Sequence, residues 1–307
     1  MAALDRRGLR AVGAIRRASA CASGDIAVVG DIGPRTEWAR ALTGARTVIH
    51  LAGIAHVPDS DAHAAQSRYA EVNTLGTLQL ARASAVAGVG RLVFVSSTKV
   101  YTPLTNNATW HEDDSPNPTD DYGRSKLAAE RGLREISAAT GLEVVIVRPP
   151  LVYGPGARAN FQRLVTCVAQ GWPLPLGSIH NRRSLVSLMN LVDALILCAT
   201  HPNAAGQIFN VADAQTVSTP ELLRLLASAL GVRARVVRMP VGLLRAAAAV
   251  LGRAADVNRL TEDHQVDTSR ILDLLGWRAP QSLNEGLAEV ARAYWGANRS
   301  ALGQPRS

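Results

Sequence analysis

The most constraining feature of the sequence is a regular alternation of short apolar segments and amphipathic segments over its first half. Such alternation predicts parallel strands joined by crossover helices that cover the faces of one sheet. Strands are expected at Leu9–Ile15, Ile26–Val29, Thr47–Leu51, Leu92–Val95 and Val144–Val147. Helices are expected at Thr36–Leu42, Tyr69–Val86 and Asp121–Ala138. We therefore predict an α/β fold with a doubly wound parallel, Rossmann-like sheet.

The rhythm changes after Pro150, where Gly154-Pro155-Gly156 predicts a sharp break. The later segments predict helices at Phe161–Gln170, Leu188–Ala199, Pro220–Leu230, Leu243–Leu251 and Leu283–Tyr294, with a strand at Gln207–Val211. We expect residues 1–155 to form a dinucleotide-binding domain and residues 156–307 to form mainly a smaller substrate-binding lid. Residues 188–212 are expected to return to the main sheet.

Composition excludes several classes of protein. The net charge is +8, but no basic run exceeds two residues and only 4% of residues are aromatic, which argues against nucleic-acid binding. The apolar runs are too short to cross a bilayer, and the first residues lack a secretory signal. Three scattered cysteines form neither a disulfide framework nor a metal site. We expect a cytoplasmic protein without a membrane or metal partner.

The strongest chemical signal is Tyr122-Gly123-Arg124-Ser125-Lys126 at the start of a predicted helix. A spacing of four residues places Tyr122 and Lys126 on one helical face. An ammonium group there is expected to lower the pKa of the phenol, so that it can exchange a proton near neutral pH. Ser97 follows an apolar strand, at the sheet edge where ligands bind. Ser97, Tyr122 and Lys126 therefore predict a catalytic site.

Motifs along most of the chain resemble the extended short-chain dehydrogenase/reductases, in the NAD-dependent epimerase/dehydratase group that acts on nucleotide sugars. The matching segments are VVGDI (Val28–Ile32), VIHLAG (Val48–Gly53), VNTLGT (Val72–Thr77), VSSTKVY (Val95–Tyr101), YGRSK (Tyr122–Lys126), VRPPLVYGPG (Val147–Gly156), RRSLVSLMNLVDA (Arg182–Ala194), IFNVAD (Ile208–Asp213) and VDTSRILDLLGW (Val266–Trp277). The segments around residues 159–194 look most like 4-ketoreductases and C4-epimerases of UDP-N-acetylhexosamines, the UDP-N-acetylquinovosamine dehydrogenase type used in surface-polysaccharide synthesis.

The resemblance implies a role for individual residues. NAD or NADP would be bound by Asp31 and Ile32 at the adenine, by Leu51, Ala52 and Gly53 along the channel, and by Asn73, Tyr122, Lys126 and Pro149. Ser97 would polarise the sugar C4 oxygen, and Tyr122 would be the acid/base. Lys126 would hold the nicotinamide ribose. Arg183 would meet the nucleotide diphosphate, with Asn160, Phe161 and Arg259 nearby. A homodimer is a further expectation.

Each of these assignments has a structural alternative. Asn73 could cap a turn, Arg183 could be a solvated loop arginine, and Asn160, Phe161 and Arg259 could serve packing. The whole chain has an alternative too, as a non-catalytic nucleotide-binding or regulatory protein of the same fold. Within the enzyme interpretation, a retained cofactor would give an epimerase and an exchanging cofactor would give a reductase.

The departure from the family pattern is at the start of the chain. The family opens with a strand and a Gly-x-x-Gly-x-x-Gly turn that binds the pyrophosphate, but Gly8, Gly13 and Gly24 lack that spacing. Met1–Arg7 resembles the end of the helix that follows this turn. About 20 residues with the central strand are then expected to be missing, through a late start codon or in a degraded paralogue. The retained Ser97, Tyr122 and Lys126 favour the late start, and unpaired strand edges with weak cofactor binding are expected.

The end of the first predicted strand bears on the choice of cofactor. The strand runs into Arg16-Arg17, and no acidic residue follows until Asp25. An acidic residue at this place binds the ribose hydroxyl of NAD, whereas arginine accommodates the phosphate of NADP. We therefore expect Arg16 and Arg17 to favour NADP, which would favour a ketoreductase. The alternative is that both are solvated charges.

Overall fold

The computed structural model describes residues 1–18, 24–55, 62–103, 108–157, 160–250, 252 and 254–302. Its centre is a parallel sheet with the strand order β3 (Thr47–His50), β4 (Arg91–Val95), β5 (Glu143–Arg148) and β8 (Ile208–Asn210). Apart from the charged residues at their ends (Arg91, Glu143 and Arg148), the inner strands β4 and β5 are apolar, as expected for strands that are covered on both faces. Because all four strands are parallel, their carboxyl ends meet at one edge of the sheet.

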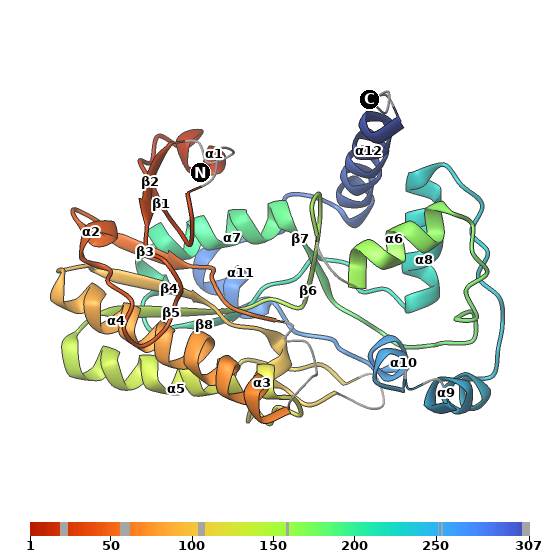
Figure 1. Ribbon diagram of the computed structural model, residues 1–307, viewed down its shortest axis with the longest axis horizontal. Coiled ribbons are helices and arrows are strands. Elements are labelled where there is room, and N and C mark those ends of the chain that lie inside the picture. The colour runs from red at the N-terminus through yellow and green to blue at the C-terminus, as the bar shows by residue number, and fades with distance from the viewer. Residues whose placement is uncertain are drawn as a thin grey trace.

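Helices cover both faces of this sheet (Figure 1). Along β4, Leu92 and Phe94 belong to the core under α4 (Gly76–Val86) and α5 (Asp121–Thr140). The alternate residue Val93 belongs to the opposite core, under α7 (Leu188–Thr200) and α11 (Ser269–Leu275). The α/β class and the parallel doubly wound sheet are therefore as predicted. The sequence analysis had not identified α11.

The two N-terminal strands form a sheet of their own. β1 (Val12–Ile15) pairs in parallel with β2 (Asp25–Val28), and within the described ranges no strand joins this pair to β3. The prediction that all five early strands share one sheet is therefore wrong. Val12 and Val28 in this pair are 52% and 55% exposed, and Leu51, directly after β3, is 66% exposed, so large apolar side chains are left uncovered here. The split leaves additional unpaired strand edges, as the sequence predicted.

Two of the predicted helices begin elsewhere. The helix expected from Tyr69 is three segments: α3 (Ala62–Tyr69), a π-helical segment η1 (Ala70–Leu75) and α4. The helix expected from Thr36 is only α2 (Ala39–Leu42). The Thr36 hydroxyl donates to the Asp31 carbonyl and accepts from the Gly33 amide, and these bonds hold a turn instead. The short helix α1 (Ala2–Asp5) precedes β1.

A second core lies beside the sheet. β6 (Leu151–Tyr153) pairs in parallel with β7 (Leu185–Ser187). Around this pair lie α6 (Asn160–Ala169), α8 (Thr219–Leu230), α9 (Val241–Val250), α10 (Ala254–Thr261) and α12 (Leu283–Leu302). The chain returns to the main sheet through α7 and β8. None of the helices in the described part of the chain has the length and apolar character needed to cross a membrane.

A close contact between α12 and β6 yields a prediction about stability. A Cβ atom on Gly286 would lie 2.7 Å from the Tyr153 hydroxyl oxygen. Tyr153 is fully buried and donates a hydrogen bond of 2.7 Å to Asp213, so its ring cannot move aside. We expect Gly286→Ala to lower the free energy of unfolding by about 1–3 kcal/mol in denaturant titrations.

The matched control lies in the same helix. A methyl group on Gly296 would meet no atom within 4 Å, so Gly296→Ala should raise the free energy of unfolding by up to about 1 kcal/mol. Equal stability of the two variants would contradict the packing of α12 on Tyr153.

Candidate active site

Ser97 and Tyr122 meet at the carboxyl edge of the main sheet. Ser97 follows β4, and its hydroxyl accepts the Lys99 amide at 3.2 Å, which starts the 3-10 turn η2 (Thr98–Val100). Tyr122 lies in the first turn of α5, where the N-cap Asp120 accepts the Gly123 amide at 2.7 Å. The Ser97 hydroxyl lies close enough to the Tyr122 phenol to lower its pKa. The structure therefore brings together a hydroxyl and a phenol from two elements.

Lys126 lies one turn further along α5 and is buried. Its ammonium group donates to the Val95 carbonyl at 2.9 Å and lies 4.6 Å from the centroid of the Phe94 ring. Burial lowers the pKa of Lys126 from 10.5 to about 8. A Cβ atom on Gly53 would lie 3.3 Å from the Lys126 nitrogen, so the loop after β3 approaches it with backbone alone.

The expected effect of Lys126 on the phenol is wrong for this structure. Burial raises the pKa of Tyr122 from 10.0 to about 12, and the Asp120 charge and Tyr69 raise it as well. The nearby Ser97 hydroxyl acts in the opposite direction and lowers this pKa. Lys126 directs its ammonium to the Val95 carbonyl and the Phe94 ring, so desolvation of the phenol outweighs the expected lowering.

Asn73 connects the loop after β3 with α5. It is fully buried in the π-helical segment, a kind of irregularity found at functional sites. Its amide nitrogen donates to the Ile54 carbonyl and the Ser125 hydroxyl, both at 3.0 Å, and its oxygen accepts the Ile54 amide at 2.9 Å. These bonds hold the loop with Leu51, Ala52 and Gly53 beside Lys126.

A buried ion pair that the sequence analysis missed underlies these residues. Glu130 and Arg148 are each 1% exposed, and the carboxylate accepts two guanidinium bonds, at 2.5 and 3.0 Å. Glu130 also accepts the Ser96 hydroxyl at 2.5 Å, and Arg148 donates to the Tyr101 hydroxyl at 2.6 Å. The available sequence signal was the spacing of Lys126 and Glu130, four residues apart on one helical face.

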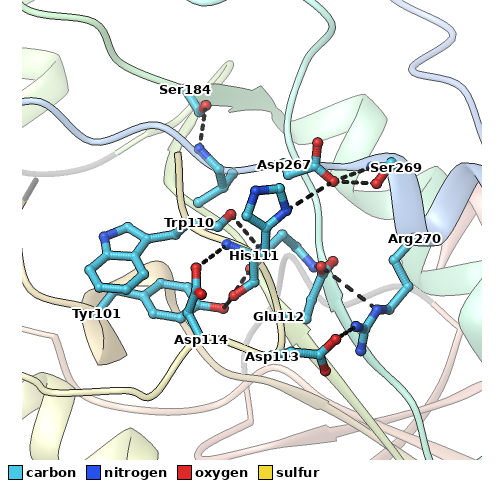
Figure 2. A network of polar contacts seen from close by, with 12 residues as sticks. Tyr101, Trp110, His111, Glu112, Asp113, Asp114, Ser184, Asp267, Ser269 and Arg270 are labelled. Atoms are coloured by element: carbon cyan, nitrogen blue, oxygen red, sulfur yellow. Dashed lines mark hydrogen bonds and ion pairs between the residues drawn. The ribbon is translucent and has the colours of Figure 1, made fainter. Parts of the chain in front are cut away.

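A second polar network ties the C-terminal segment to the sheet edge (Figure 2). The Trp110 amide donates to the Gln265 carbonyl at 2.9 Å, and the Asp267 amide donates to the Trp110 carbonyl at 2.9 Å. Arg270 pairs with the carboxylates of Glu112 and Asp113. These contacts fix the segment that precedes α11.

The same segment carries His264 to the site. Its imidazole Nε2 lies 2.6 Å from the hydroxyl oxygen of Thr98, the residue after Ser97. Burial lowers the pKa of His264 to about 4, so the imidazole is neutral at physiological pH. Sequence patterns had not singled out His264 or Thr98, because their contact joins residues far apart in the chain.

Arg183 lies beside His264 and is partly buried. Its backbone pairs with Val217 in both directions, at 3.0 and 3.1 Å, and bridges to His264. The Nε atom is buried and has no hydrogen-bond partner among the described residues. Burial lowers the pKa of Arg183 below its usual value. An anionic ligand would supply the partner that this guanidinium lacks.

Of the remaining candidate residues, only Pro149 contacts this cluster within the described residues. Arg16 and Arg17 are exposed at the end of β1, and Arg16 pairs with Asp31. Ile32 packs against the α4–α5 core, and the Pro149 carbonyl accepts the Thr98 amide at 3.0 Å. The backbones of Asn160 and Arg259 lie in α6 and α10, and their side chains fall outside the described residues. Phe161 is buried in the second core.

The loop after β3 comes very close to Asn73 and Lys126 at Gly53. A Cβ atom on Gly53 would lie 3.0 Å from the Asn73 side-chain oxygen, so only a bare backbone fits beside Asn73 and Lys126. Ser97, Tyr122 and Lys126 line the same edge of the sheet. Within the described ranges the β1–β2 sheet is separate from β3, so Arg16 and Asp31 do not share a sheet with this cluster.

Comparison with known proteins gives consistent matches. Residues 1–212 match the NAD dependent epimerase/dehydratase family. A UDP-glucose 4-epimerase of Vibrio cholerae is 42% identical over 93% of this chain and 88% of its own length. A GDP-6-deoxy-D-mannose reductase of Pseudomonas aeruginosa is 29% identical over 79% of this chain and 78% of its own. The structure of MoeE5 in complex with UDP-glucose and NAD has a TM-score of 0.77 at 27% identity and covers 98% of this chain, with 94% of MoeE5 aligned.

The buried lysine yields a prediction about pH and stability. Because the pKa of Lys126 is lower in the folded chain, the unfolded chain binds the proton more readily between pH 8 and 10.5. The cost of burying the ammonium is therefore fully present below pH 8 and is lost as the pH rises toward 10.5. We expect Lys126→Met to raise the free energy of unfolding at pH 7 by about 1–3 kcal/mol, with the gain shrinking above pH 8.

The control is Arg134→Met, at an exposed position of the same helix. This variant should change the free energy of unfolding by less than about 0.5 kcal/mol, with no trend between pH 7 and 10. A Lys126→Met chain that is less stable than the parent at pH 7 would mean that the ammonium is not penalised by burial.

Proposed function

The chain belongs to the NAD dependent epimerase/dehydratase family, and we propose that it transfers hydride at C4 of a UDP-sugar, as a 4-ketoreductase or a C4-epimerase. The observation that carries this proposal is the placement of Ser97 after β4, Tyr122 in the first turn of α5 and the buried Lys126 at one edge of the sheet. NAD or NADP, when bound, supplies the hydride donor or acceptor. A place in surface-polysaccharide precursor synthesis is part of the proposal.

Tyr122 would act as the acid/base. Because the pKa of the phenol is about 12 in this structure, the phenol is protonated at neutral pH and can donate to a ketone oxygen. Ser97 would hold that oxygen with its hydroxyl, and Lys126 would hold the nicotinamide ribose. In the reverse direction, the tyrosinate that is left after this donation would accept the proton of the C4 hydroxyl.

Arg183 would bind the diphosphate of the substrate. Its buried, unpartnered Nε atom supports this role, because an anion would complete its hydrogen bonding. The Vibrio cholerae relative is named for UDP-glucose, and MoeE5 was solved with UDP-glucose, which supports a UDP-sugar. The Pseudomonas aeruginosa relative is named a reductase, which supports the 4-ketoreductase alternative.

A second candidate function is nucleotide binding without catalysis. The observation in its favour is the separate β1–β2 sheet, because a dinucleotide of this fold class normally lies across a continuous sheet edge. We expect this chain to bind NAD(H) and NADP(H) weakly. Assays should therefore use millimolar cofactor and a panel of UDP-hexoses and UDP-4-keto sugars, with product identification by mass spectrometry. Absence of turnover with every substrate would favour the non-catalytic function.

The acid/base assignment is tested by Tyr122→Phe, which keeps the ring and removes the transferable proton. We expect turnover to fall by about 100- to 10,000-fold at saturating substrate. Ser97→Ala should cost less, because water can replace one hydroxyl. Tyr294→Phe, in α12, is the control and should leave turnover unchanged. Near-normal turnover of Tyr122→Phe would refute the mechanism.

The cofactor preference is tested with Arg16 and Arg17. A guanidinium binds a phosphate strongly, so we expect a higher kcat/KM with NADPH than with NADH. The double variant Arg16→Ala/Arg17→Ala should lose this preference. Asp31→Asn removes the carboxylate that pairs with Arg16 and should strengthen the preference. A tenfold or greater preference for NADH in the parent chain would contradict the arginine argument and favour an epimerase.

A further inference from the structure

Both lysines of this chain lie beside Tyr122. The sequence holds only Lys99 and Lys126 among 33 basic residues, and the other 31 are arginines. Lys126 is part of the proposed site. Lys99 lies in the turn η2, two residues after Ser97, with its nitrogen 5.9 Å from the centroid of the Tyr122 ring. The proposed function assigns no role to the Lys99 ammonium group.

Asp120 links Lys99 to the helix that carries Tyr122. One carboxylate oxygen of Asp120 accepts the Gly123 amide at 2.7 Å, and the other accepts the Lys99 ammonium at 2.5 Å. The helix and the turn also meet directly, since a Cβ atom on Gly123 would lie 2.3 Å from the Lys99 carbonyl oxygen. One carboxylate therefore holds the start of α5 against the turn that begins at Ser97.

The same carboxylate acts on the phenol through its charge. Asp120 raises the pKa of Tyr122, because a negative charge nearby disfavours the tyrosinate. The other groups that face this site are Lys126 from α5, Tyr69 from α3, and Lys99 and Ser97 from the turn. His264 lies beyond Thr98 and is neutral, because burial lowers its pKa to about 4. The Lys99 ammonium is thus the cation placed to offset Asp120.

We infer that Lys99 is a positioning residue for the proposed reaction: through Asp120 it fixes the start of α5 beside Ser97 and cancels the negative charge next to the phenol. The inference rests on the proposed acid/base role of Tyr122. The contacts that carry it exist without substrate or cofactor, so they can be tested separately from turnover.

The test places a fluorinated probe at Tyr122. Incorporation of 3,5-difluorotyrosine at this position lowers the phenol pKa into a range where the fold survives, and fluorine-19 NMR follows its titration in the full chain without ligand. The variants are Lys99→Met, Lys99→Arg, Asp120→Asn and the double variant Lys99→Met/Asp120→Asn. Asparagine is as good an N-cap as aspartate, so Asp120→Asn removes the charge and keeps the helix start.

We expect Lys99→Met to raise the phenol pKa by about 0.5–1 pH unit, the size of effect that a partly solvent-exposed charge at this range would have. Lys99→Arg should restore the parent value, and the double variant, which removes both charges, should titrate close to the parent. A Lys99→Met phenol that titrates like the parent, or a double variant that titrates like Lys99→Met, would overturn the inference. If Lys99→Met unfolds, the other two variants decide. The inference is supported if the phenol pKa has the parent value in Lys99→Arg and is lowered in Asp120→Asn. It is overturned if the phenol pKa is unchanged in Asp120→Asn.

A second measurement follows turnover at saturating cofactor and substrate. Lys99→Met should move the pH profile of kcat toward higher pH and leave KM within about twofold, because Lys99 acts on the phenol rather than on the substrate. A large rise in KM with an unmoved pH profile would instead make Lys99 a substrate contact and overturn the inference. If the parent chain has no turnover, the proposed function fails, and the fluorine titration still decides the role of Lys99.

Discussion

The buried ion pair of Glu130 and Arg148 is the contact on which the candidate site depends. It joins α5, β5 and, through Ser96, the end of β4, at a depth where each side chain is 1% exposed. Removing one partner of such a pair costs about 3–5 kcal/mol, because the other charge is left buried and unpaired. Ser97 and Tyr122 lie on two of the elements that this pair connects. The distance between Ser97 and Tyr122 is thus fixed by Glu130 and Arg148, which are buried below the sheet edge.

The polar framework continues from this pair to the C-terminal segment. Arg148 donates to the Tyr101 hydroxyl, which in turn contacts Asn210 at the end of β8. Asn210 donates its amide to Glu112, and Glu112 pairs with Arg270. Hydrogen bonds in a chain of this kind rigidify the elements that carry them. The sheet edge and the segment that carries His264 are therefore held as one framework, which places Arg183 near the residue that follows Ser97.

The two halves of the proposed cofactor site differ in their construction. The half with Tyr122 and Lys126 rests on the main sheet and its buried network. The half with Arg16 and Asp31 rests on the small β1–β2 sheet, whose Val12 and Val28 are more than half exposed. A two-stranded sheet with exposed apolar residues is intrinsically less stable than a covered one. We therefore expect the residues around Tyr122 and Lys126 to be held more rigidly than the residues that would bind the adenine end of the cofactor.

The sequence alone determined the α/β class, most helices and strands of the main sheet, and the family, because hydrophobic periodicity and short motifs are local signals. It also determined that Tyr122 and Lys126 share a helical face. Only the tertiary structure decided that β1 and β2 form a separate sheet, since strand pairing depends on partners distant in the chain. It also decided that Glu130 pairs with Arg148, that His264 meets Thr98, and that burial raises the pKa of Tyr122. Each of these depends on desolvation and on contacts between distant segments, which no local pattern encodes.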